Sequence, residues 1–252
     1  MEKNVRYPIE AFGLAMVLFS TGMKEAMLAG IAVVLGHVLM NVLLDNTGSS
    51  MKKVCAVVGG VVAAAAIILV CIFAGVEITT WQKAAAVVIG VLIAKHGLDA
   101  AEECDFNQIL LADALAYGAM VLVAIIREYV GTGAVYTIAL KKNTLMSPEL
   151  GRAMIAIAAA GIALGIINKI VDSDCAKNAG LWVCVPIILL EAPFITEKAS
   201  VAVAMIIGMV IVLAVYLASR ILLQFSDNKE NMEGVPVEMV LLGLIYLVVA
   251  IV

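Results

Sequence analysis

The chain has 252 residues, of which 64% are hydrophobic and 14% are charged, and its formal net charge is −4. Soluble domains contain roughly 45–50% apolar and about 25% charged residues, so this composition excludes an ordinary soluble protein and predicts an integral membrane protein. The charges are spread through short loops without a basic block, and we expect no nucleic-acid partner.

Apolar segments of two lengths follow one another along the chain. Crossing the hydrocarbon core of a bilayer takes about 20 residues in a helix. The segments that approach or reach this length are 26–44, 54–76, 108–126, 153–168, 199–219 and 235–252. The segments 8–20, 82–94 and 181–190 are too short to cross upright. We expect an all-α protein that crosses a cell's inner (plasma) membrane several times.

Each short segment ends at a polar break that contains glycine or proline. The breaks are residues 20–25, 95–99 and 191–194, with Gly22, Gly97 and Pro193 as the helix-breaking positions. A helix that stops inside hydrocarbon leaves backbone groups unpaired, so such breaks survive only where protein or a polar cavity surrounds them. The breaks therefore predict half-helices around a buried functional centre.

The order short, long, long occurs three times along the chain, which predicts three copies of one unit. A unit with three crossings ends on the opposite side of the membrane from where it began. Neighbouring copies would then be inverted repeats. We therefore predict an all-α polytopic fold of three-segment inverted repeats with broken half-helices.

Ionisable residues gather at the second break. Lys95, His96 and Asp99 lie together, and Glu102 follows closely. An ionisable group at membrane depth costs a few kcal/mol, so it needs a partner or water. Because imidazole titrates near neutrality, these residues suit a proton or cation relay. The alternative is an acidic loop at the membrane surface.

Glu191 is a further candidate for the ion path. It follows the apolar residues 185–190 and lies two positions before Pro193, which cannot donate a backbone hydrogen bond. Burial disfavours the charged form of a carboxyl group, which suits a proton carrier. A structural ion pair with Arg127, Arg220 or a lysine is the alternative.

Other polar residues favour structural roles. His37 and Asn41 are spaced i, i+4 and share a helix face, so we expect them to form hydrogen bonds between helices. Asp113 lies one turn into its predicted helix, where it either caps the helix or binds an ion. Arg127 and Glu128 end that helix, and we expect them to anchor at the membrane interface by snorkelling.

The cysteines give no confident metal site. The five cysteines contain no C-x-x-C pair and no zinc-type spacing with histidine. His96 and Cys104, eight positions apart, are a weak metal-ligand pair.

Several stretches resemble one known family. The helix that begins near Asp113 and ends in Arg127-Glu128, followed by Gly131-Thr-Gly133, resembles the paired small membrane subunits of the Rnf and Na+-translocating NADH:quinone reductase (Nqr) complexes. Residues 24–30 and 151–167 resemble the second and last helices of that family. The resemblance implies a membrane domain of two inverted repeats at 1–171 and an additional, diverged repeat at 172–252.

The resemblance also implies a function. It implies a membrane subunit of an ion-translocating redox complex that moves Na+ or H+ beside other membrane subunits and is not catalytic alone. The family holds an iron–sulfur cluster with cysteines at its broken helices, but residues 21–23 and 95–97 contain no cysteine. A relative without the cluster, contributing scaffold and an ion path, is therefore expected, and other cofactors are unknown. The alternative is a stand-alone secondary transporter or channel for a cation or small solute.

Overall fold

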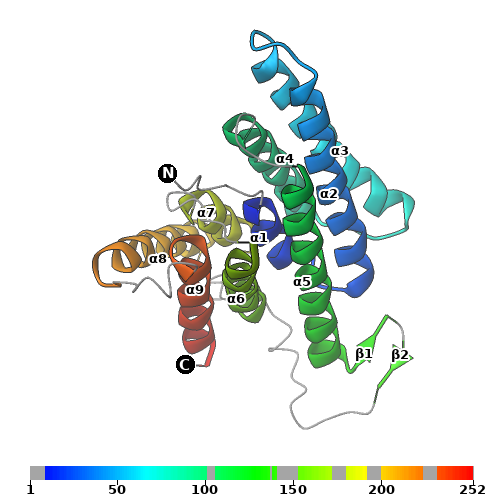
Figure 1. The fold of residues 1–252 in the computed structure, drawn as a ribbon. Coiled ribbons are helices and arrows are strands. Elements are labelled where there is room, and N and C mark those ends of the chain that lie inside the picture. The colour runs from blue at the N-terminus through cyan, green and yellow to red at the C-terminus, as the bar shows by residue number, and fades with distance from the viewer. Residues whose placement is uncertain are drawn as a thin grey trace.

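The computed structural model describes residues 9–100, 106–136, 138–140, 153–171, 180–191, 200–223 and 232–251 (Figure 1). In this part of the chain the fold consists of helices and one very short hairpin. The helices are α1 (Ile9–Leu18), α2 (Met23–Asp45), α3 (Lys52–Phe73), α4 (Thr80–Ala100), α5 (Phe106–Thr132), α6 (Ala153–Val171), α7 (Gly180–Glu191), α8 (Val201–Ile221) and α9 (Val235–Ile251). The hairpin pairs β1 (Ala134–Val135) with β2 (Ile138–Ala139) in antiparallel register.

The observed helices confirm the all-α class and the multi-pass character. Each predicted apolar segment corresponds to one helix, because a long apolar run can satisfy its backbone in lipid only by coiling. Five helices are long and apolar enough to cross a membrane, namely α2, α3, α5, α6 and α8. Helices α7 and α9 are shorter apolar helices.

Helix α4 corrects one prediction. It has 21 residues and runs through Gly97 without a break, so it is neither short nor interrupted at that position. A Cβ atom at Gly97 would lie 2.5 Å from Cγ of Met40 on α2. The glycine therefore allows α4 and α2 to pack closely, and it does not end the helix. The predicted break at Pro193 lies outside the described residues.

Helix α1 lies in the interior of the protein. Figure 1 shows it in dark blue, between α2 to α5 on one side and α6 to α9 on the other. It packs against α2, α4, α5, α6 and α7, and residues 11–20 are all buried. Its 10 residues span about 15 Å, half the thickness of a hydrocarbon core. Helix α1 is thus a buried half-helix that ends within the protein.

Glycine contacts bring two helix pairs close together. A Cβ atom at Gly60 on α3 would lie 2.5 Å from the carbonyl oxygen of Gly90 on α4. On α6, a Cβ atom at Gly161 would lie 2.6 Å from the carbonyl oxygen of Pro236 on α9. Small residues at such crossings allow the backbones to touch, which is a common way to pack helices in lipid.

Candidate functional site

The carbonyl groups at the C-terminal end of α1 all accept hydrogen bonds inside the protein. The last four carbonyl groups of a helix have no partner within the helix. Here all four accept hydrogen bonds: Ala15 O from the Phe19 amide (2.9 Å), Met16 O from the Ser20 hydroxyl, Val17 O from Arg127 Nη1 (2.9 Å), and Leu18 O from Gln82 Nε2 (3.1 Å). The end of the half-helix is therefore held by side chains of α4 and α5 as well as by its own turn.

Arg127 is buried against this end of α1. It is only 4% exposed, and its Nη1 atom also donates to Ser20 Oγ at 2.8 Å. A cation at a helix C-terminus is favoured by the negative end of the helix dipole. The expectation that Arg127 snorkels to the interface is therefore wrong, because the carbonyl groups of α1 give the guanidinium partners in the interior.

Glu128 holds the other side of the same break. Its Oε2 atom accepts from the amide of Met23, the first residue of α2, at 2.7 Å. Its Oε1 atom accepts from the amide of Tyr136 at 3.0 Å. A carboxylate at a helix N-terminus is favoured by the positive end of the dipole. Gly22, with extended backbone, lies in the break between the two helices that Arg127 and Glu128 contact.

Glu25 and Gln82 complete the polar junction, and neither is among the site residues predicted from the sequence. Gln82 Nε2 donates to Glu25 Oε1 at 2.6 Å, and Thr21 Oγ1 donates to Glu25 Oε2. Both side chains are 8% exposed. In the sequence, Gln82 is a lone amide side chain at the start of the apolar segment 82–94, and in lipid such a side chain needs a hydrogen-bond partner.

A second polar centre joins α2 to α5. His37 Nδ1 lies 3.0 Å from Asp113 Oδ1, and each side chain is only 1% exposed. His37 thus makes the expected bond between helices. Asp113 does not cap α5, because that helix begins at Phe106, about two turns earlier. Within the described part of the chain, His37 Nε2 and Asp113 Oδ2 are buried without a hydrogen-bond partner.

His96 on α4 belongs to the same centre. Its ring centroid is 6.2 Å from that of His37, in an edge-on arrangement at 71°. Among the described residues, its Nε2 atom is also buried without a hydrogen-bond partner. Phe12 of α1 packs on the other side, with its ring centroid 6.0 Å from that of His37. The two histidines of the chain therefore meet beside the half-helix.

The remaining predicted site residues are placed only in part. Lys95 Nζ lies 3.7 Å from Glu10 Oε2 at the start of α1, and Lys95 is 37% exposed. Asp99 lies one turn after Lys95 in α4, and Glu191 is the last residue of α7, but their side chains are not among those described. Glu102 and Cys104 lie outside the described residues.

Asn41 departs from its expected role. Its Nδ2 atom donates to the carbonyl oxygen of His37 at 3.0 Å, one turn earlier in the same helix. The predicted bond between helices is thus made by His37 and not by Asn41, because this amide finds an acceptor on its own backbone.

The described residues hold no group of three or more histidine, cysteine, aspartate or glutamate side chains that could bind a metal. Cys55 and Cys71 lie on α3 and Cys184 lies on α7, all as free thiols. No set of thiolates for an iron–sulfur cluster is present among these residues.

Glu238 is a buried carboxyl group that is not among the site residues predicted from the sequence. It lies in the first turn of α9, is 1% exposed, and accepts from Ser219 Oγ of α8 at 3.3 Å. Its Oε2 atom also lies against Gly180, where α7 begins. From the start of α9, Glu238 therefore contacts the end of α8 and the start of α7. Glu128 of α5 contacts the start of α2 in a similar way.

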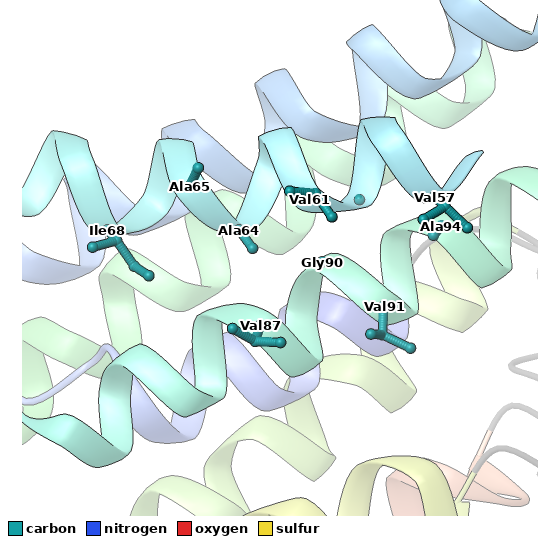
Figure 2. A pocket seen from close by; sticks show the side chains of 10 residues that line it. Val57, Val61, Ala64, Ala65, Ile68, Val87, Gly90, Val91 and Ala94 are labelled. Carbon is teal, nitrogen blue, oxygen red and sulfur yellow. The ribbon is translucent and has the colours of Figure 1, made fainter. Parts of the chain in front are cut away.

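The outer face of α3 and α4 carries an apolar groove, shown in Figure 2. Only valine, isoleucine, alanine and glycine line it: Val57, Gly60, Val61, Ala64, Ala65, Ile68, Val87, Gly90, Val91 and Ala94. This lining suits lipid chains and offers no polar chemistry, so the candidate site is the polar interior around α1.

No protein-family model, no curated protein and no solved structure matches this chain. The resemblance to the Rnf and Nqr membrane subunits therefore stays a prediction.

Proposed function

We propose that the chain is a multi-pass membrane protein that moves a cation through its interior between α1, α2, α4 and α5. The observation that carries this proposal is the buried His37–Asp113 pair beside His96, with nitrogen and oxygen atoms still open to a ligand. Ionisable residues inside a membrane cost several kcal/mol unless paired, and they mark ion or proton pathways. In this proposal the protein lies in an inner (plasma) membrane, and the cation is H+ or Na+.

The proposed scaffold is a set of inverted repeats, α1–α3 and α4–α6, with α7–α9 as a third unit. The contacts of Leu18 with Gln82 and of Glu10 with Lys95 make α1 and α4 antiparallel. The contacts of Met23 with Glu128 and of His37 with Asp113 make α2 and α5 antiparallel. Antiparallel pairing of corresponding helices supports this repeat and the proposed division at residues 171 and 172.

The proposed setting is a redox complex of the Rnf or Nqr kind. Arg127 and Glu128 support it, because they belong to the most specific part of the resemblance. Arg127 binds the end of α1 and Glu128 binds the start of α2, on the two sides of the break between these helices. In this setting the chain contributes scaffold and ion path, and partner subunits carry the redox centres. Glu191→Gln would then abolish flux if Glu191 continues the path, and unchanged flux would remove it from the mechanism.

A stand-alone transporter or channel is the second candidate. It is favoured by the enclosure of α1, since helices of this same chain bury residues 11–20 without help from another subunit.

Reconstitution tests these proposals. Purified chain in liposomes should pass protons or Na+ down an imposed gradient, measured with a dye for internal pH or for Na+. Flux by the chain alone would support the transporter. Absence of flux by the chain alone, combined with co-purification of flavin-bearing subunits and flux by that complex, would support the redox setting. If neither preparation passes either ion, the proposal of cation movement fails.

A further inference from the structure

We propose that the cation bound by the interior centre is a proton, held on the side chains of His37 and Asp113, and is not Na+; this choice of ion rests on the proposed function. The two side chains come from α2 and α5, lie 3.0 Å apart, and are each only 1% exposed. Binding of a proton to this pair requires one nitrogen lone pair and no further ligand.

The open atoms of the centre suit a proton. Within the described residues, His37 Nε2, His96 Nε2 and Asp113 Oδ2 have no hydrogen-bond partner. Nδ1 of His37 lies against Asp113 Oδ1, so in the neutral ring Nδ1 donates its proton to the carboxylate and the lone pair lies on Nε2. Imidazole is the side chain that takes up and releases protons near neutral pH. Nε2 of His37 is therefore the atom that receives the proton.

Na+ requires a different set of atoms. Hard cations take oxygen ligands, and transporters supply them to Na+ from unwound backbone and from helix C-terminal ends. Here His37, His96 and Asp113 each lie inside an unbroken helix, where the backbone carbonyl groups accept hydrogen bonds from the same helix.

Other oxygen ligands are also taken up or lacking. At the buried end of α1, the last four carbonyl groups all accept hydrogen bonds from the protein. The described part of the chain holds no group of three or more histidine, cysteine, aspartate or glutamate side chains that could bind a metal ion. The centre thus offers a proton a site without offering Na+ a coordination shell.

The charges at the centre also favour a proton. With a neutral His37, the Asp113 carboxylate is a buried negative charge whose partner is uncharged, whereas a proton on His37 turns the two into an ion pair. A buried charge without a charged partner costs more than a buried pair. The titratable neighbours are His96, whose ring centroid is 6.2 Å from that of His37, and the adjacent Lys95, whose charge Glu10 of α1 offsets at 3.7 Å.

Histidine nitrogen resonances test which ion binds, because the chain has two histidines. The full chain, labelled with nitrogen-15 at histidine and purified in detergent without Na+, is titrated from about pH 8 to about pH 5. We expect Nε2 of His37 to gain a proton while Nδ1 stays protonated. Replacing choline with Na+ at constant pH and ionic strength should leave both rings unchanged. His96→Gln identifies the resonances that belong to His37. If Nε2 of His37 stays unprotonated throughout, or if Na+ shifts its resonance, the proposal is overturned.

Two variants test whether the carboxylate holds the proton. Asp113→Asn keeps the shape of the side chain but removes its charge, so the pH midpoint of His37 protonation should fall by about 1 unit or more, a tenfold or larger loss of proton affinity. Asn41→Ala is the matched control, because the described contact of Asn41 is with the backbone carbonyl oxygen of His37, and its midpoint should equal that of the wild type. Equal midpoints in the wild type and in folded Asp113→Asn would refute this role of Asp113.

Flux in liposomes separates the choice of ion from the proposed function. A pH gradient without Na+ should drive flux, and a Na+ gradient at equal pH should not. Na+ flux that Asp113→Asn abolishes would overturn the choice of the proton and leave cation movement through this centre intact. Titration of His37 as expected, without flux of either ion in any preparation, would contradict only the proposed function.

Discussion

Replacement of Arg127 by methionine tests whether α5 holds the end of the buried half-helix. Methionine keeps much of the volume but removes the donors to Val17 O (2.9 Å) and Ser20 Oγ (2.8 Å). Each hydrogen bond from a charged donor contributes about 1.5–3 kcal/mol, so we expect a loss of about 3–6 kcal/mol in the free energy of unfolding. The carbonyl group of Val17 would remain buried without this donor, which places the loss in the upper part of that range.

Arg220→Met is the matched control. Arg220 is exposed near the end of α8, and its guanidinium lies 5.1 Å from the ring centroid of Tyr216. An exposed cation–π contact contributes about 0.5–1 kcal/mol. Thermal unfolding of both variants in one detergent measures the difference. At about 2–4 °C per kcal/mol, Arg127→Met should lower Tm by about 6–24 °C, and Arg220→Met by only a few degrees. Equal effects of the two substitutions would refute the role of Arg127 at the break.

Two further substitutions probe the same architecture. Glu128→Gln keeps one acceptor, for the Met23 amide, but removes the charge at the start of α2 and the acceptor for the Tyr136 amide. We expect a loss of about 0.3–2 kcal/mol from the dipole and a further loss of about 0.5–1.5 kcal/mol from the hydrogen bond in the unfolding assay, and no loss would contradict the role of Glu128 at the start of α2. Gly90→Ala adds a Cβ atom against the carbonyl oxygen of Gly60 and should destabilise the protein by about 1–3 kcal/mol. Gly118→Ala is its control, since a Cβ atom there meets no atom within 4 Å, and it should stabilise the helix by up to about 1 kcal/mol. A similar shift in both alanine variants would argue against close packing of α3 and α4.

Local features of the sequence predict the helices well. The length of an apolar run and the need to satisfy backbone groups in lipid are properties of the segment itself, so each run corresponds to a helix. Residues 19–22 separate α1 from α2, at the polar stretch that contains Gly22.

Gly97 shows where local reasoning fails. Its surroundings in the sequence resemble a break, yet α4 continues through it, and Met40, on another helix, fills the space that a side chain at this position would occupy. The sequence alone does not reveal which glycine ends a helix and which one admits a neighbouring helix.

The candidate site depends on contacts between residues far apart in the chain. Asp113 is 76 positions from His37, and Arg127 is 110 positions from Val17. The polar character of these residues was recognisable, but their partners were not, because nothing local specifies which helices adjoin. Arg127 lies in the interior and not at the membrane interface, because the carbonyl groups at the buried end of α1 accept hydrogen bonds from its guanidinium.

We propose that the buried centre of His37, Asp113 and His96 carries the cation. The most direct measurement compares flux through liposomes of the wild-type chain, or of its complex, with that of Asp113→Asn and of the control Asn41→Ala. We expect Asp113→Asn to abolish flux and Asn41→Ala to retain it, with both variants shown to be folded by their unfolding transitions. Full flux in folded Asp113→Asn would show that the cation does not pass through this centre.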